Sequence, residues 1–181
     1  MRFGKARWLG SQACRWLAGL EAGVWAGLAV VGWFALTAAW SQRSFWDLPN
    51  RLGSLFYGPQ ALRAGFHAAT LAGLAFHLFT SAVVGLLFAG LAREGRNRVR
   101  AALLALVTGL AWCYAAYAWF WRRLLPPAGG TPPPWLLAAY LLFGVVLGGY
   151  PGRLRSAERH FHGEAEPARG MMADQGGPAP G

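Results

Sequence analysis

Charged residues are scarce in this chain of 181 residues, and their scarcity excludes an ordinary soluble globular protein. Only 13% of the residues are charged, whereas 55% are hydrophobic, and the mean hydropathy is +0.31. A soluble domain carries about a quarter of its residues as Asp, Glu, Lys and Arg. The composition therefore predicts an integral membrane protein.

Acidic residues are especially few, at 7 against 17 lysines and arginines, and the formal net charge is +10. The arginines lie at the ends of apolar stretches and form no stripe along one face. This is the distribution expected for contacts with anionic lipid headgroups. A nucleic-acid-binding protein would gather its basic residues into one footprint. We therefore expect the lipid bilayer as a partner and no nucleic acid.

Cysteine and methionine are also rare, and catalytic motifs are lacking. Cys14 precedes the first apolar stretch and Cys113 lies within the third, so they should differ in depth and form no disulfide. The cysteines lack the spacing of a zinc site. No nucleophile has a base and an orienting group beside it, and no glycine loop for phosphate occurs. The sequence predicts no enzyme and no catalytic residue.

Four apolar stretches are long enough to cross a bilayer, so we expect an all-α membrane protein with four transmembrane helices. The second stretch is the most uniform, because it has no charged residue and holds its one strongly polar side chain, His77, at its middle. The predicted spans cover residues 22–40, 64–92, 101–121 and 135–150. Together they form a transmembrane domain over residues 16–151.

Two terminal segments flank this domain. Residues 1–15 are basic, and the apolar run that follows is too long for a cleaved signal sequence, so we expect a retained first span. Residues 152–181 are polar and rich in Gly, Pro, Glu and Arg, which predicts a disordered tail. Lys and Arg concentrate in both terminal segments and in the loop at 93–100. The positive-inside rule then predicts that both termini are cytoplasmic.

The first loop, residues 41–63, should form an interfacial segment. Asp47 is placed to cap a short helix, with Pro49 in its first turn. Arg51 would face the headgroups. The residues expected to face lipid are Leu48, Leu52, Leu55 and Phe56.

Glycine, with 25 residues, recurs at intervals of four in the first and fourth predicted spans, and the second span has a stripe of small or polar residues at the same spacing, from Gly73 through His77, Ser81 and Gly85 to Ala89. Residues four apart share a helix face, and a face of small residues lets two helices approach closely. The inner half of the first span carries Gly23 and Gly27. The inner half of the second carries Gly85 and Ala89, so these two surfaces should touch. The predicted helix-packing residues are Gly19, Gly23, Gly27, Gly73, Ser81, Gly85, Gly144 and Gly148.

His77 must be neutral and hydrogen-bonded at mid-depth, because no water is there to satisfy its ring nitrogens. We expect it to point inward, near Val31 and Gly32 of the first span and residues 108–114 of the third. It would then fasten helices together and contribute about 0.6 to 2 kcal/mol. The candidate partners are Thr80, Thr108, Tyr114 and a carbonyl freed by close glycine packing.

His77 is also a candidate for a ligand-binding or proton-transferring role. His67 and His77 lie about 15 Å apart along one helix, so they cannot bind one haem iron. A haem would need a second ligand from another chain, in a homodimer or a larger membrane complex, and we expect no cofactor within one chain. Glu21 should reach the inner headgroups beside Arg15 or Arg93. The alternative is a small proton-coupled transporter or channel that uses Glu21 and His77, with Ser81 one turn away.

A glycine-rich first span, an outer segment with Trp, Pro and Arg, and a helix with His, Ser and Gly at intervals of four follow one another. The residues that carry this order are Phe45, Trp46, Asp47, Pro49, Arg51, Gly58, Pro59, His77, Ser81 and Gly85. The order resembles a group of small four-span bacterial inner-membrane proteins of unassigned function, over about residues 19–92. The resemblance implies a multi-pass protein of the bacterial inner membrane and no reaction. The favoured hypothesis is a non-enzymatic accessory or assembly subunit that packs against a partner through its Gly/Ser helix faces.

Overall fold

The computed structural model describes residues 2–63, 65–92, 98–124 and 131–163, and these ranges are helical with short turns and contain no strand. Four helical segments are long and apolar enough to cross a membrane. They cover Gln12–Trp40, Ala68–Leu91, Arg98–Leu124 and Pro134–Ala157. The prediction of an all-helical protein with four helices able to span a membrane is confirmed.

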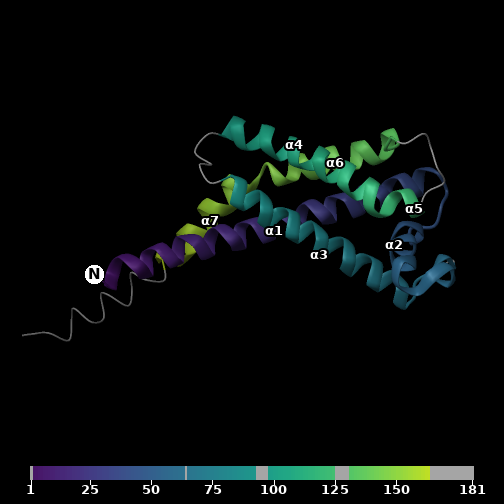
Figure 1. Ribbon diagram of the computed structural model, residues 1–181, viewed down its shortest axis with the longest axis horizontal. Helices are drawn as coiled ribbons and strands as arrows, with labels where there is room; N and C mark the ends of the chain where they lie inside the picture. The colour runs from purple at the N-terminus through teal and green to yellow at the C-terminus, as the bar shows by residue number, and fades with distance from the viewer. Residues whose placement is uncertain (1, 64, 93–97, 125–130, 164–181) are drawn as a thin grey trace, which may run out of the picture.

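Nine helical elements make up these ranges (Figure 1). In chain order they are α1 (Arg2–Trp40), α2 (Asp47–Tyr57), the 3-10 helix η1 (Gly58–Leu62), α3 (Ala68–Leu91), α4 (Arg98–Ala116), the π-helical η2 (Tyr117–Trp121), α5 (Arg122–Leu124), α6 (Pro134–Leu147) and α7 (Tyr150–Gly163). The elements α4, η2 and α5 continue one another as one rod. The third span therefore changes its helical pitch near its end without breaking.

The helix α1 is the centre of the bundle. It packs against α3 on one side and against α6 and α7 on another, while α4 packs against α6 and makes few contacts with α3 (Figure 1). The bundle thus consists of two antiparallel pairs, α1 with α3 and α4 with α6, joined through α1 and α6. The start of α1 and the helix α7 lie at the same end of the molecule. The short helix α2 packs against α3 near the opposite end.

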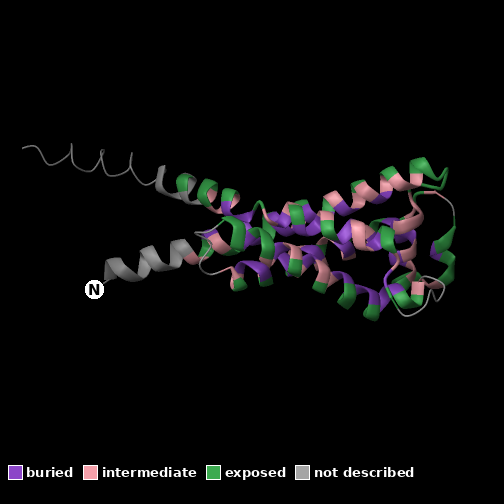
Figure 2. Cartoon of the chain, turned by 90° about the horizontal axis from the view of Figure 1, so that it is seen from above, coloured by how far each residue is buried: buried purple, intermediate pink, exposed green. Residues whose placement is uncertain are grey.

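Burial follows the inward faces of the long helices, and the outward faces are exposed (Figure 2). On α1 the buried face carries Ala18, Ala22, Ala26 and Val30. Because these side chains are small, α1 can pack against α3 and α6 at the same time. The outward faces carry large apolar side chains, among them Trp25, Leu36, Phe79, Leu87, Leu91 and Val145. Apolar exposure of this extent suits contact with lipid and would be a liability in water.

The helix boundaries depart from the predicted spans at three places. The basic segment is part of α1, which begins at Arg2. The second span begins at Ala68 instead of residue 64, because Gly65 has a φ of 100° and a capping box between His67 and Thr70 starts α3. The fourth span does not end at residue 150, because α7 continues to Gly163.

The predicted disordered tail is therefore wrong for residues 152–163, which are helical, and its remainder, residues 164–181, lies outside the described residues. Pro151 and Gly152, which follow the fourth predicted span, do not end the helix. Pro151 instead lies in the first turn of α7, where a missing N–H is tolerated. Tyr150 is fully buried and its ring meets that of Phe88 at 5.6 Å, which anchors α7 to the bundle.

The helix α2 also differs in detail from its prediction. Trp46 is the N-cap residue and Asp47 is the first helical residue, so Asp47 provides no side-chain cap. Leu52 is buried instead of facing lipid, whereas Leu55 and Phe56 are exposed. The reason is that α2 packs one face against α3. That face consists of Pro49, Asn50, Leu52 and Gly53.

Candidate functional site

The helices α1 and α3 approach at backbone contact along the glycine face. A Cβ atom on Gly85 would lie 2.7 Å from the Cα and 2.8 Å from the N of Gly23. A Cβ on Gly19 would lie 2.8 Å from the carbonyl oxygen of Gly85. No side chain fits at such distances from a backbone atom. The close approach of these two helices therefore requires glycine at these positions.

The register of this interface is close to the predicted one. Gly23 lies against Gly85 as expected, but Gly27 lies against Ser81, whose Oγ would be 2.7 Å from an added Cβ. Ala89 lies opposite Gly19. The two glycine faces are thus paired within the chain.

The remaining small residues have other neighbours than the predicted stripe implies. Gly73 faces α2, where an added Cβ would be 2.8 Å from the N of Gly53. Gly144 packs against α4, with an added Cβ 2.9 Å from the Cα of Leu106. Gly109 completes this second crossing, where an added Cβ would be 3.1 Å from the Cα of Gly144. Sequence reasoning missed Gly109 because no other glycine lies four residues before or after it. Gly148 lies in the turn before α7, where an added Cβ would be 3.2 Å from the carbonyl oxygen of Val145 and 3.6 Å from the Cα of Ala102.

His77 is buried, with 5% of its surface exposed, and points at α1. Its Nε2 lies 3.1 Å from the carbonyl oxygen of Gly27 and donates to it in the tautomer that carries a proton on Nε2. A carbonyl on the glycine face is thus the partner, one helical turn from the expected Val31. The two expected hydroxyl partners, Thr80 and Thr108, donate instead to carbonyls of their own helices.

The third span does not approach His77 as expected, because α3 and α4 make few contacts and Tyr114 is exposed. Ser81 is fully buried beside Gly27, and its Oγ has no hydrogen-bond partner among the described residues. Ser81 therefore serves as a small residue in the helix crossing.

Glu21 lies on a different side of α1 from this interface. Its Oε1 is 3.6 Å from Nε of Arg153 in α7, and its side chain is 54% exposed. The expected neighbour Arg15 instead donates to the carbonyl of Ala89, and Arg93 lies outside the described residues. The structure does not bring Glu21 and His77 together.

A hydrogen-bond network that sequence reasoning missed fastens α2 to the start of α3. Asn50 is buried, and its Nδ2 donates to the carbonyl oxygens of Arg63 and Gly65, both at 3.0 Å. The hydroxyl of Thr70 donates to the side-chain oxygen of Asn50. The same Thr70 oxygen accepts from the backbone N–H of His67 at 3.0 Å. The only signal in the sequence was the pair His67 and Thr70 at capping-box spacing.

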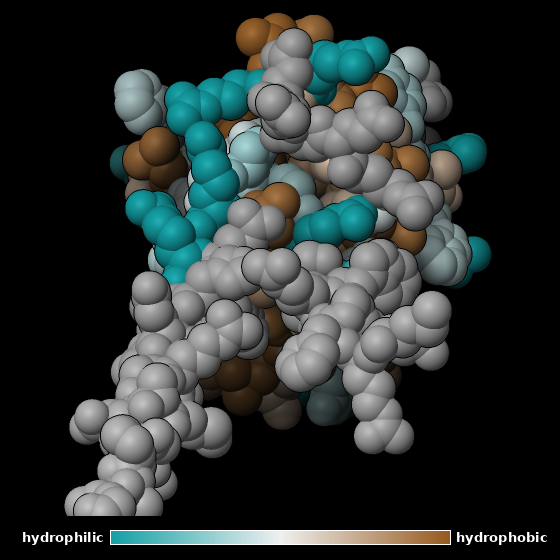
Figure 3. Space-filling view, turned by 90° about the vertical axis from the view of Figure 1, so that its left-hand side faces the viewer, coloured by the Kyte–Doolittle hydropathy of each residue, from teal (hydrophilic) through white to brown (hydrophobic). Residues whose placement is uncertain are grey.

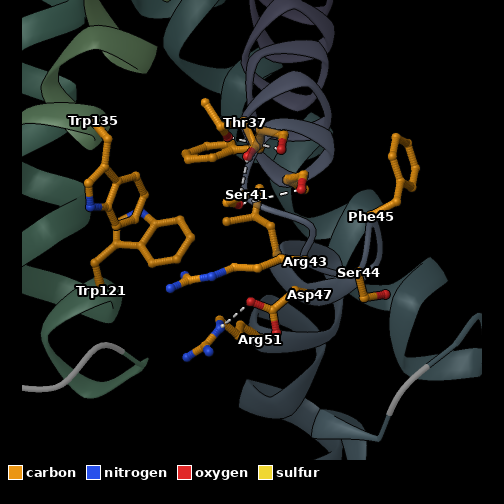
Figure 4. A pocket seen from close by; sticks show the side chains of 12 residues that line it. Thr37, Ser41, Arg43, Ser44, Phe45, Asp47, Arg51, Trp121 and Trp135 are labelled. Atoms are coloured by element: carbon orange, nitrogen blue, oxygen red, sulfur yellow. Dashed lines mark hydrogen bonds and ion pairs between the residues drawn. The ribbon is translucent and has the colours of Figure 1, made fainter.

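A cavity of about 790 Å³ opens beside the end of α1, between the 41–47 connection, α2, η2 and the start of α6 (Figure 4). Trp121 and Trp135 lie on one side of it, and Arg43, Asp47 and Arg51 lie on the other. The lining residues are Phe34, Thr37, Ala38, Ser41, Arg43, Ser44, Phe45, Asp47, Leu48, Arg51, Trp121 and Trp135. The cavity therefore combines an aromatic wall with charged groups.

The charged side chains that line this cavity differ in how many polar partners they have. Nε of Arg51 pairs with Oδ2 of Asp47 at 3.1 Å, and Nη1 of Arg51 donates to the carbonyl of Leu124 at 3.2 Å. The backbone N–H of Arg43 donates to the carbonyl of Ala38 at 2.9 Å, but its guanidinium makes no ion pair or hydrogen bond within the described ranges. The lining thus has an excess of one positive charge.

The predicted interfacial segment contributes side chains to two different environments. Asp47 and Arg51 line the cavity, and Pro49 is buried with its carbonyl against Gly73. Trp46 contributes its ring to an aromatic cluster, 4.6 Å from the ring of Phe45. Only the charged half of the motif thus lies where a ligand has access.

Among the described residues, no group of three His, Cys, Asp or Glu side chains gathers in one place. Cys14 and Cys113 are both buried, and no disulfide joins them. No protein family, curated protein or solved structure matches the chain. Its function must therefore be argued from this geometry.

Proposed function

We propose that the protein is a non-enzymatic multi-pass protein of the bacterial inner membrane that serves as an accessory or assembly subunit. The observation that supports this proposal is the hydrogen bond from His77 to the carbonyl of Gly27. The one histidine buried among the spans is used to join two helices, and the glycine faces beside it are closed by backbone contact. The polar and small residues of the spans thus build a rigid bundle.

A partner would use a surface other than the Gly/Ser faces, because these faces are occupied inside the chain. The outward faces of the spans carry large aromatic and aliphatic side chains that another membrane protein can cover in place of lipid. The resemblance to small inner-membrane proteins over residues 19–92 remains part of this proposal.

We further propose that both termini lie in the cytoplasm. The start of α1 and the helix α7 share one end of the bundle, and hydrophilic side chains gather over that end (Figure 3). Most lysines and arginines of the sequence belong to the segments at this end. The positive-inside rule places such an end in the cytoplasm. The cavity beside Arg43 then faces the opposite compartment.

Purification in a mild detergent tests the accessory role. We expect the chain, with a mass of 19.5 kDa, to migrate in a complex with a second polypeptide in fixed ratio. Migration as a lone monomer or as a pure homo-oligomer, in detergent that preserves other membrane complexes, would contradict the proposal.

Reconstitution into liposomes separates this role from that of a proton-coupled transporter. We expect no proton flux above that of empty liposomes, and His77→Leu should lower stability by about 0.6 to 2 kcal/mol. Thr80→Val is the matched control, because Thr80 bonds only to its own helix. Flux that vanishes in His77→Leu while the fold is retained would replace the structural role with a transport role. A Soret band that is present in the wild type and lost in His77→Leu would replace the structural role with haem binding.

A further inference from the structure

The cavity beside the end of α1 is built of two unlike halves. One half is an aromatic wall formed by Phe34, Trp121 and Trp135. The centroid of the Phe34 ring lies 5.6 Å from that of Trp135 and 6.4 Å from that of Trp121. Arg43 and Arg51 lie on the facing side (Figure 4). A ligand that fills both halves must have a charged end and an apolar part.

The charged half favours an anion. Arg51 is neutralised by Asp47 and held in place by the carbonyl of Leu124, so its guanidinium is oriented before a ligand arrives. Arg43 adds a guanidinium that has no partner within the described part of the chain. Guanidinium groups donate in a planar fork that matches the oxygens of phosphate and carboxylate.

The hydroxyl groups of the lining add no donor beside the two arginines. The side chains of Thr37 and Ser41 donate to carbonyls of α1, at 3.0 Å and 2.7 Å, so their protons are used. Ser44 instead accepts from the backbone N–H of Trp46 at 3.3 Å, which leaves its proton free to donate. In Figure 4 the Ser44 side chain points away from the guanidinium groups of Arg43 and Arg51, so the two arginines alone face the tryptophans.

The position of the cavity fits the end of a lipid. Tryptophans crowd this end of the spans, at Trp40, Trp119, Trp121 and Trp135, and tryptophan is enriched at the boundary between headgroups and acyl chains. Trp121 donates its indole N–H to the hydroxyl of Tyr140, which fixes the ring that forms the cavity wall. The aromatic wall thus belongs to the spans, and the arginines lie beyond the end of α1. This order matches that of the acyl chain and the headgroup in a lipid.

We propose that this cavity binds the phosphate-bearing end of an amphiphile whose headgroup has a net negative charge. Arg43 and Arg51 would contact the phosphate, and Phe34, Trp121 and Trp135 would cover the first part of the apolar chain. A volume of about 790 Å³ is within the range of pockets that hold drug-sized molecules. The proposal depends on the membrane location and not on the accessory role, so the two can fail separately.

Lipid retention in native mass spectrometry tests the proposal. Protein released from nanodiscs of equal parts phosphatidylglycerol and phosphatidylcholine should keep one phosphatidylglycerol in preference to phosphatidylcholine. Arg43→Gln should weaken this binding about tenfold, the effect of losing one hydrogen bond to a charged group. Arg43→Lys should lose less, since it keeps the charge. Arg63→Gln is the matched control, because Arg63 is an exposed arginine of the same connection that does not line the cavity.

A second variant removes the space and keeps the charges. Ala38→Trp places a ring in the cavity from α1 and should abolish the preference for phosphatidylglycerol while both arginines remain. Equal retention of the two lipids by wild type, or equal losses in Arg43→Gln and Arg63→Gln, would overturn the proposal. Displacement of the lipid by millimolar glycerol phosphate would support phosphate recognition and point to a soluble ligand. Resistance to that competitor would assign the site to the lipid.

Discussion

Gly85 is the residue at which the smallest chemical change should have a large structural effect. Replacement by alanine adds one methyl group, which would lie 2.7 Å from the Cα and 2.8 Å from the N of Gly23. Both atoms belong to the backbone of α1 and cannot rotate away. The helices α1 and α3 must separate, and the nearby contacts of Gly19 with Ala89 must open with them.

The free-energy cost of this clash can be measured by comparison with the same substitution at a second glycine of α3. A Cβ on Gly90 would meet only the Trp16 ring, at 3.7 Å, which is an ordinary contact. Gly85→Ala and Gly90→Ala gain the same helix propensity, so the difference between them reports the clash. Overpacking of a closed contact costs about 1 to 3 kcal/mol. Gly85→Ala should be less stable than Gly90→Ala by this amount.

Unfolding by SDS in mixed micelles, followed by tryptophan fluorescence, measures this difference. The same experiment tests whether the interface acts as a unit. His77 lies two helical turns from Gly85, and a separation of about 1 Å would take its Nε2 beyond hydrogen-bonding distance of the Gly27 carbonyl. His77→Leu should therefore cost less in the Gly85→Ala background than in the wild type.

Equal stability of Gly85→Ala and Gly90→Ala would refute the reasoning, because it would mean that α1 and α3 do not meet at backbone contact. Strict additivity of Gly85→Ala and His77→Leu would refute the coupling alone. In that case the glycine contact and the histidine hydrogen bond would stabilise the bundle independently.

Three further predictions concern other parts of the bundle. Asn50→Ala leaves the carbonyls of Arg63 and Gly65 without their donor and the buried Thr70 hydroxyl without its acceptor, and should lower the unfolding free energy by about 1 to 3 kcal/mol, with faster proteolysis of residues 58–67. Glu21→Gln removes a half-exposed ion pair and should change the same quantity by less than about 1 kcal/mol in the SDS titration. Single cysteines in place of Arg63 and Arg155 should be labelled by a membrane-impermeant maleimide from opposite sides of the membrane, with Arg155→Cys reactive from the cytoplasm.

The features that sequence reasoning predicted are those set by local periodicity. Apolar length alone shows that four helices can span a membrane, and a spacing of four places Gly19, Gly23 and Gly27 on one face whatever the helix packs against. The antiparallel order of neighbouring spans then brings this face to Gly85. Only the register had to come from the structure, since it depends on how the side chains at the crossing interdigitate.

The features that sequence reasoning missed depend on tertiary neighbours. Gly73 belongs by spacing to the same stripe as Gly85, yet it packs on α2, because α3 extends beyond α1 and meets the connecting helix there. In the sequence, Asn50 is one polar residue of an amphipathic segment. Its burial follows only from the fold, in which Arg63 and Gly65 lie beside it. The cavity between Arg43 and Trp135 joins residues far apart in the sequence, so no single stretch carries its signal.

The hydrogen bond of His77 also explains why a glycine is needed at Gly27 for more than space. Within a helix each carbonyl already accepts from the N–H four residues later, and its second lone pair can accept from another donor. Because Gly27 has no Cβ, α3 lies near enough for this oxygen to accept from Nε2 of His77 at 3.1 Å. The same absence of a Cβ lets Ser81 come near enough to hold α3 in register. One glycine thus provides both the acceptor and the proximity, and Gly27→Ala should abolish the hydrogen bond even if the imidazole remains buried.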